Sequence, residues 1–400
     1  MKIAIFNDYQ LPIPAVKGGS VPNLIGMLLD ENEKRGDLDI TVYSTYHEKA
    51  VEESKKYKKA KFVFSKEARR IKFFTNLKFV VMTKLRLPFK MANVPMPRSA
   101  KKHFVKQKYD LVYIAGYIRG VNEIVKYSNA PVIYHHHVVT DILNEKTIYG
   151  KKIFEECRGI FFVSKYAQDF AKTGISEYDN KMSVLLNAID TSRFNCNDKD
   201  EIKKKIRKKL GFGQNDTIIL FSGRMVKHKG CLEVIRAFND AKFDSSVKLV
   251  AMGGATFGSK KITPYIQKCF DEAKTNSNIT FLGYVPYSEI HEYYIAADIS
   301  TLPSRWNEAA GLVGIESMAA GLPVITTDRA GIGEYVAEGC KIVVPDDDNI
   351  VAGFSEAMKT LVNSPEMRKE MAKIGEERVK IFSKESYYDR FVNIMKEQLK

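Results

Sequence analysis

Short apolar runs alternate along the chain with glycine-containing loops and with stretches of helical period. Residues 2–6 form the first apolar run, residues 7–20 form a loop with two prolines and two glycines, and residues 21–34 place leucine and isoleucine on one side of a helix. Such a unit opens a doubly wound α/β domain, which binds ligands at the carboxyl ends of its strands. Further strands are predicted at residues 38–43, 109–114, 131–134, 159–163, 218–222, 248–252, 279–285 and 322–327.

Length and cysteine usage narrow the class of protein. A chain of 400 residues suits two domains of ordinary size, each with its own core. None of the five cysteines forms a C-x-x-C pair, which argues for a reduced, cytosolic compartment without a disulfide framework or a zinc site. The first apolar run is too short for a signal peptide, and no run reaches the ~18 apolar residues of a membrane-spanning helix.

The net charge of +15 is concentrated in one segment. Residues 49–108 contain 19 Lys and Arg against three acids, so this segment alone is +16. Within it, residues 66–91 mix basic side chains with aromatic and aliphatic ones. This composition suits an anionic membrane surface, where each Lys or Arg contributes about 1 kcal/mol, although a core-packed helix with a solvated polar face has the same pattern. No nucleic-acid-binding motif accompanies the segment, so we expect a membrane partner and no nucleic acid.

The predicted strand at residues 218–222 leads into a loop with two cations between glycines. Gly223 and Arg224 follow the strand, and Lys229 and Gly230 precede the next helix. A nucleotide diphosphate needs cations that reach it from one short loop, where Arg supplies a fork of donors and Lys a point charge. A charged surface turn is the alternative, but the position of the loop in an α/β unit favours a phosphate site.

Two acids and a run of small residues characterise residues 304–335. If residues 309–318 are helical, Glu308 and Glu316 lie about 2.2 turns and roughly 80° apart. Glu308 would then sit at the helix entry, where unpaired backbone N–H groups attract negative charge. A helix–turn–strand unit with two solvated glutamates would give the same pattern.

The same stretch resembles the E-x7-E signature of retaining GT-B glycosyltransferases, in particular glycosyltransferase family 4. The resemblance covers residues 311–313 (GLV), 316–325 and 331–334 (GIGE). Where that family has Glu-Pro-Phe-Gly, residues 308–311 read Glu-Ala-Ala-Gly, which keeps the acid and the glycine but loses a bulky ring. The resemblance implies an α/β fold of GT-B type, with two Rossmann-like doubly wound domains that face each other across a cleft.

The resemblance also implies roles for individual residues. Arg224 and Lys229 would neutralise the diphosphate, Glu308 would hold hydroxyls of the donor sugar, and Glu316 would accept from the nucleotide ribose. The catalytic residues would be Arg224, Lys229, Glu308 and His137. The rest of the donor site would comprise Gly18, Gly19, Gly223, Gly253, Tyr284 beside the base, Gly311, Leu312 and Val313. An ordinary tight turn is the alternative for Gly18 and Gly19.

Three adjacent histidines end the predicted strand that begins at residue 131. Side chains alternate along a strand, so His135 and His137 share one side while His136 takes the other, and the three cannot all hold one metal ion. In the family that the chain resembles, a histidine commonly ends this strand at the acceptor side. The register favours His137, with His135 on the same side, and a hydrogen bond to a loop backbone is the alternative for each.

Taken with the resemblance, the sequence predicts an acceptor-binding domain at residues 1–195, a donor-binding domain at 196–382 and a helix at 383–400 that returns to the first. The expected activity is retaining, metal-independent transfer from a nucleotide-diphosphate sugar, expected to be a UDP-sugar, to a glycan or lipid-linked glycan in cell-surface polysaccharide biosynthesis. No cofactor is expected, and the expected location is cytoplasmic, peripheral at the inner face of the membrane. A nucleotide-sugar epimerase of the same fold and a catalytically silent nucleotide- or carbohydrate-binding protein are the alternatives.

Overall fold

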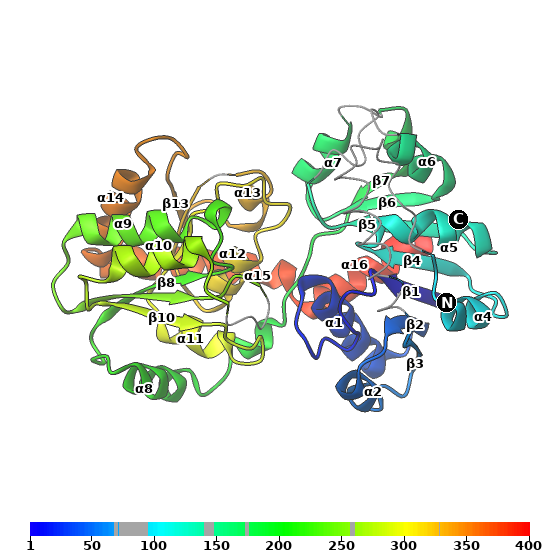
Figure 1. The fold of residues 1–400 in the computed structure, drawn as a ribbon, viewed down its shortest axis with the longest axis horizontal. Coiled ribbons are helices and arrows are strands. Elements are labelled where there is room, and N and C mark those ends of the chain that lie inside the picture. Colours follow the sequence, from blue (N-terminus) through cyan, green and yellow to red (C-terminus); the bar gives the residue numbers. More distant parts are fainter. Residues whose placement is uncertain (68–70, 72–94, 140–147, 173–175, 257–260, 328) are drawn as a thin grey trace. The chain divides into compact units, whose positions relative to one another are not determined.

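The computed structural model describes the chain except for residues 68–70, 72–94, 140–147, 173–175, 257–260 and 328 (Figure 1). The described residues form two compact units, each with its own parallel sheet. Unit 1 comprises residues 1–187 together with 384–400, and unit 2 comprises residues 188–383. This α/β architecture, with a Rossmann-like sheet in each unit, confirms the predicted fold class.

Unit 1 contains a seven-stranded sheet in the order β3-β2-β1-β4-β5-β6-β7, in which every pairing is parallel. Its strands are β1 (Lys2–Asn7), β2 (Asp39–Thr45), β3 (Ala60–Ser65), β4 (Leu111–Ala115), β5 (Val132–His136), β6 (Gly159–Phe162) and β7 (Met182–Val184). The strand order reverses between β1 and β4, where Ile3 pairs with Ile40 on one side and with Leu111 on the other. The loops after β1, β4 and β5 therefore gather at one edge of the sheet, which is where such sheets bind ligands.

The helices of unit 1 include one from the far end of the chain. They are α1 (Ser20–Arg35), α2 (Glu48–Ser54), α4 (Arg98–Phe104), α5 (Val121–Tyr127), α6 (Ile148–Glu156), α7 (Lys165–Lys172) and α16 (Lys384–Glu397). Helix α16 lies beside α1 (Figure 1), and the Tyr388 hydroxyl donates to Oδ1 of Asn32 over 2.8 Å while Arg35 pairs with Asp389. These contacts anchor the chain end in unit 1.

Part of the basic segment contributes to this fold. Helix α2, the edge strand β3 and helix α4 all come from residues 48–104, and none of the three was predicted from the sequence. Phe62 and Phe64 stack on one face of β3 with ring centroids 5.7 Å apart. The basic and aromatic stretch expected to dock on a membrane, residues 66–91, falls largely outside the described residues. Among those that are described, no helix is both long and apolar enough to cross a bilayer.

Unit 2 contains a six-stranded parallel sheet in the order β10-β9-β8-β11-β12-β13. The strands are β8 (Thr217–Ser222), β9 (Val247–Met252), β10 (Ile279–Gly283), β11 (Ile299–Leu302), β12 (Val324–Thr326) and β13 (Lys341–Val343). The helices are α8 (Lys199–Leu210), α9 (Cys231–Ala241), α10 (Pro264–Ala273), α11 (Ile290–Ala296), α12 (Leu312–Ala319), α13 (Ile332–Tyr335), α14 (Ile350–Val362) and α15 (Pro365–Val379). Here the order reverses between β8 and β11, so their carboxyl-end loops, residues 223–230 and 303–311, lie together.

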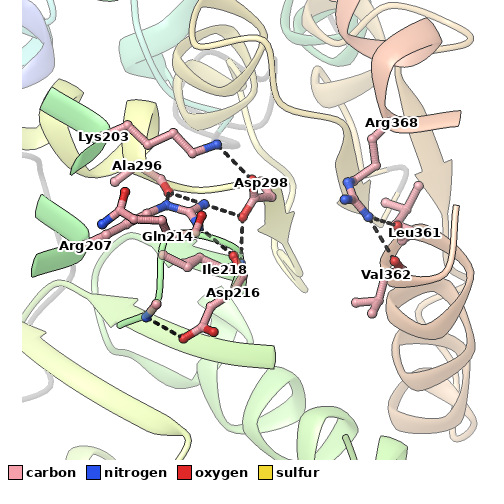
Figure 2. A network of polar contacts seen from close by, with 11 residues as sticks. Lys203, Arg207, Gln214, Asp216, Ile218, Ala296, Asp298, Leu361, Val362 and Arg368 are labelled. Atoms are coloured by element: carbon pink, nitrogen blue, oxygen red, sulfur yellow. Dashed lines mark hydrogen bonds and ion pairs between the residues drawn. The ribbon is translucent and has the colours of Figure 1, made fainter. Parts of the chain in front are cut away.

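A buried arginine holds the opposite, amino-terminal ends of the same two strands (Figure 2). Arg207 of α8 is 1% exposed and donates to the carbonyls of Gln214, Asp216 and Ala296 and, over 2.6 Å, to the carboxylate of Asp298. Asp298 also accepts from the backbone N–H of Ile218, at the start of β8. The guanidinium thus satisfies polar groups that burial would otherwise leave unpaired, which fixes β8 and β11 side by side.

Candidate functional site

Three glycines bring the carboxyl ends of β8, β9 and β10 into direct backbone contact. A Cβ built on Gly253 would lie 1.7 Å from the carbonyl oxygen of Gly223, so only glycine fits there. Both residues have positive φ, 156° for Gly223 and 146° for Gly253. The N–H of Gly253 donates to the carbonyl of Gly283 over 2.8 Å. The predicted donor residues Gly223 and Gly253 therefore form one corner of the site.

A cavity of about 320 Å³ opens beside this corner. Its lining includes Gly253, Gly254 and Gly283 together with apolar residues such as Phe281 and Ile266. Tyr284, predicted to lie near the base, is also part of the lining and is 37% exposed. A cavity lined by apolar side chains and by glycine backbone groups suits a planar heterocycle.

The cation Lys229 and the acid Glu308 meet at the carboxyl ends of β8 and β11. Lys229 ends the short 3-10 turn Lys227–Lys229, and its Nζ donates to Oε1 of Glu308. The turn packs tightly against the loop after β11, because a Cβ on Gly230 would lie 2.1 Å from the carbonyl oxygen of Pro303. Both charged side chains are mostly buried, at 22% exposed for Lys229 and 13% for Glu308.

Two further contacts fix the position of Glu308. The hydroxyl of Ser304 donates to the same carboxylate oxygen, Oε1, over 2.6 Å, and Ser304 is fully buried. The backbone carbonyl of Glu308 accepts from the N–H of Gly331 over 2.8 Å. The acid is thus held by the loop after β12 as well as by its own loop, so its carboxylate is preorganised.

A histidine and a tryptophan that the sequence analysis missed also belong to this cluster. Nε2 of His228 lies 3.5 Å from a guanidinium nitrogen of Arg224, and its ring centroid lies 5.4 Å from that of Trp306. Burial, followed by the positive charges of Arg224 and Lys229, lowers the pKa of His228. The position of His228 between two predicted phosphate-binding cations was the sequence signal that could have identified it.

Glu316 occupies a different environment from Glu308, and the predicted helix geometry was wrong. Helix α12 begins at Leu312, after Gly311 as its N-cap, so Glu308 lies in the preceding loop and only Glu316 is helical. Glu316 is 6% exposed, and its Oε2 accepts from the Tyr294 hydroxyl over 2.8 Å. Burial raises the pKa of Glu316 to about 7, against the opposing effects of Tyr294 and Arg193. The predicted residues Gly311, Leu312 and Val313 form the N-cap and first turn of this helix.

The candidate residues of unit 1 form a second cluster. His135 and His137 share one side of the chain, as predicted, with ring centroids 4.1 Å apart, and Nδ1 of His135 lies 2.6 Å from the Tyr113 hydroxyl. His136 pairs instead with Tyr134, at 3.0 Å. Burial lowers the pKa of all three rings, to about 4 for His136 and about 3 for His137, so they are neutral near pH 7.

The glycine pair after β1 approaches the same place. Gly18 and Gly19 have positive φ of 70° and 110° and lead directly into α1. A Cβ built on Gly116, which follows β4, would lie 3.6 Å both from the His137 ring and from Val21 in the first turn of α1. The loops after β4 and β5 and the first turn of α1 therefore lie close together near His137. Among the described residues, no group of three or more His, Cys, Asp or Glu side chains could hold a metal ion.

Known proteins that are similar to this chain include glycosyltransferases. Residues 202–378 match the family described as Glycosyl transferases group 1. Over 385 residues, the chain is 23% identical to spore coat protein SA of Bacillus subtilis (strain 168), which covers 93% of each protein. The match to the family spans all of the Arg224, Lys229, Glu308 and Glu316 positions.

Solved structures resemble the whole chain. A glycosyltransferase from Rickettsia africae ESF-5 superposes with a TM-score of 0.73 at 19% identity, covering 100% of this chain and 98% of that one. Anabaena Alr3699/HepE in complex with UDP and glucose superposes with a TM-score of 0.70 at 16% identity, covering 98% and 99%. The chain therefore has the GT-B fold, and the comparisons together support a glycosyltransferase.

Proposed function

We propose that the protein is a retaining glycosyltransferase that moves a sugar from a nucleotide-diphosphate sugar, most simply a UDP-sugar, to a glycan or lipid-linked glycan. The observation that carries this proposal is the contact between Lys229 and Glu308, beside Arg224, at the reversal of strand order in unit 2. In the proposed site, the cations would bind the diphosphate and the neighbouring acid would bind the sugar. The complex of HepE with UDP and glucose supports the choice of donor.

In the proposed reaction, the bond between the anomeric carbon and the diphosphate oxygen breaks through an oxocarbenium-like transition state. Arg224 and Lys229 stabilise the negative charge that builds on the leaving phosphate, an electrostatic effect worth several kcal/mol in a water-excluded site. Glu308 holds hydroxyls of the transferred sugar. The acceptor hydroxyl attacks on the same face as the departing phosphate, and its proton passes to the phosphate oxygen, so the configuration is retained and no metal is required.

The remaining candidate residues bind the nucleotide part of the donor and the acceptor. The cavity at Gly253 and Tyr284 takes the base, and Glu316 accepts from the ribose hydroxyls. Gly18 and Gly19 of unit 1 belong to the donor site, whereas His137, with His135 on the same side of the strand, serves the acceptor side. We accordingly assign acceptor binding mainly to the first unit and donor binding mainly to the second.

The proposed setting is cell-surface polysaccharide assembly at the cytoplasmic face of the membrane. The support is the charge of +16 in residues 49–108, which attracts anionic lipid headgroups. Sedimentation with anionic and with neutral vesicles tests this part separately. We expect association with anionic vesicles at low salt and its loss at high salt, because the attraction is screened; no association at low salt would reject membrane docking.

The test of the activity is a panel of nucleotide sugars. A donor that binds the folded protein raises its melting temperature, so thermal shift identifies the donor first. Incubation with glycoside and lipid-linked acceptors should then yield a product with the donor's anomeric configuration. An inverted product would reject retention, whereas an epimerised nucleotide sugar without any acceptor would reject transfer.

A further inference from the structure

The single tryptophan of the chain lies beside the proposed catalytic acid and is largely exposed. Trp306 precedes Glu308 by two residues, and 53% of its surface is accessible to solvent. An isolated exposed apolar side chain carries no functional meaning by itself. The exposed indole is notable here because contacts of the residues before and after Trp306 hold its loop in place.

The residues next to Trp306 are held by several contacts. The N–H of Arg305 donates to the carbonyl of His228 over 2.9 Å, and its guanidinium pairs with Glu233 at 3.1 Å and with Asp346 at 2.8 Å. On the far side of Arg305, Ser304 is buried, and its carbonyl accepts from the Thr327 hydroxyl. The backbone at Trp306 is therefore anchored to the strand ends β8 and β12 while the indole points to solvent.

The His228 ring supports the indole from one side. The two rings lie 5.4 Å apart at an interplanar angle of 47°, a tilted aromatic contact. His228 in turn lies beside Arg224 and is followed by Lys229. Arg224, the proposed diphosphate-binding cation, thus contacts His228, which in turn contacts Trp306. The mostly buried pair of Lys229 and Glu308 belongs to the same cluster.

We propose that Trp306, supported by His228, is a stacking platform for a sugar ring of the acceptor. One face of a pyranose exposes C–H groups, and covering them with an indole removes apolar surface from water. This inference rests on the proposed function, since it names the substrate group that a further residue of the same site recognises.

The exposed fractions of Lys229, Glu308 and Trp306 indicate that the platform contacts the acceptor and not the donor. Lys229 and Glu308, which the proposal gives to the donor, are 22% and 13% exposed, so the transferred sugar occupies a recessed position. Trp306, two residues before Glu308, is far more exposed, at 53%. An acceptor hydroxyl must approach the anomeric carbon from solvent, and the ring that carries it then passes the indole.

Because Trp306 is the only tryptophan, its emission reports directly on the platform. The full-length protein, saturated with UDP, is titrated with methyl glycosides of glucose, galactose, mannose and N-acetylglucosamine. We expect a saturable change in emission with at least one glycoside, and a much smaller change with UDP alone. Emission that responds to nucleotide sugar but to no glycoside would overturn the proposal.

Kinetics with substituted proteins complete the test. With the most effective glycoside as acceptor, Trp306→Ala should raise the KM for the acceptor about three- to tenfold, from the loss of one stacking contact, and leave the KM for the donor unchanged. Trp306→Phe should restore most of the affinity, and Met367→Ala, which truncates a 37% exposed side chain on α15, should have no effect. A rise in the donor KM alone would overturn the assignment to the acceptor.

Different experimental results would contradict the stacking platform and the proposed transferase activity. If the wild-type protein transfers no sugar from any donor but a glycoside still perturbs the emission, the platform stands and the transferase proposal falls. If transfer proceeds while no glycoside perturbs the emission and Trp306→Ala has normal kinetics, the platform alone falls.

Discussion

Nζ of Lys229 donates to Oε1 of Glu308, although 79 positions separate the two residues in the sequence. The contact forms because Lys229 follows β8 and Glu308 follows β11, and these strands are neighbours where the strand order reverses. Opposite charges thus meet at the point where a parallel sheet binds its ligand. In the proposed reaction each of the two partners has its own charge to stabilise, one on the phosphate and one on the sugar.

Substitution of either partner should reduce turnover strongly. Lys229→Met and Glu308→Gln are each expected to lower kcat by about 100- to 1,000-fold, the usual effect of removing one group that stabilises transition-state charge. The measurement is initial velocity with the donor identified by thermal shift. Lys227→Met, in the same turn, is the matched control and should retain near wild-type activity. Near-normal kcat in either site variant would contradict the role given to that residue.

Ser304 should act as a positioning residue for Glu308. Ser304→Ala removes the 2.6 Å hydrogen bond to the carboxylate but adds no bulk. We expect kcat to fall about ten- to a hundredfold, because small displacements of a catalytic group are costly, while the affinity for UDP is unchanged. Ser304→Thr should recover part of the rate. Equal losses in kcat and in UDP affinity would indicate a general disturbance of the loop.

Arg207 should be important for stability and not for chemistry. Arg207→Leu leaves the carboxylate of Asp298 and several carbonyls without their buried partner. The free energy of unfolding, measured by denaturant titration, should fall by about 3–5 kcal/mol. Lys203→Met, which removes the more exposed partner of the same Asp298, should cost far less. Comparable losses in the two variants would contradict a special role for the buried guanidinium.

Glu316 should make stability depend on pH in a defined direction. Its pKa is raised to about 7 in the folded protein from a normal value of 4.5. Below pH 4.5 the carboxyl is protonated in both the folded and the unfolded state, so it does not reduce stability. The destabilisation develops as the pH rises from 4.5 through 7, because the carboxyl ionises first in the unfolded chain. By pH 8 it reaches about 3 kcal/mol.

Glu316→Gln removes this titration but keeps an acceptor for the Tyr294 hydroxyl. Between pH 5 and pH 8 the wild-type protein should therefore lose more stability than the variant, as measured by denaturant titration at each pH. Glu338→Gln, an exposed carboxyl in the same unit, should follow the wild-type curve. Parallel curves for the wild type and Glu316→Gln would show that Glu316 does not titrate in this range.

The sequence predicted the central strands well because they are continuous apolar runs. It missed β3, where Lys61 interrupts the apolar pattern and pairing with β2 supplies the order. It also placed the start of α12 too early. Ala309 and Ala310 favour helix, but the hydrogen bond from Gly331 to the Glu308 carbonyl holds this stretch in a loop. A contact with a distant segment can override local helix propensity, and such a contact cannot be inferred from the local sequence.

The sequence singled out the charged residues of the candidate site but not the contacts that they make. Arg224, Lys229 and Glu308 became candidates through their position and the family resemblance, whereas Ser304, His228 and Trp306 became candidates only through the residues that they contact. Tyr294 is a similar case: it bonds Glu316 from a helix that sequence periodicity did not identify. The partners of a known acid lie on other loops, at distances along the chain that no local pattern encodes.

The contact of Gly253 with Gly223 has an evolutionary consequence. Where these strand ends touch through peptide groups alone, only backbone atoms form that corner of the cavity. A side chain at Gly253 would clash with Gly223, so mutation can change what the cavity recognises only at its other lining residues, such as Tyr284. Descendants of this chain could therefore change the proposed donor specificity without altering the backbone of this corner.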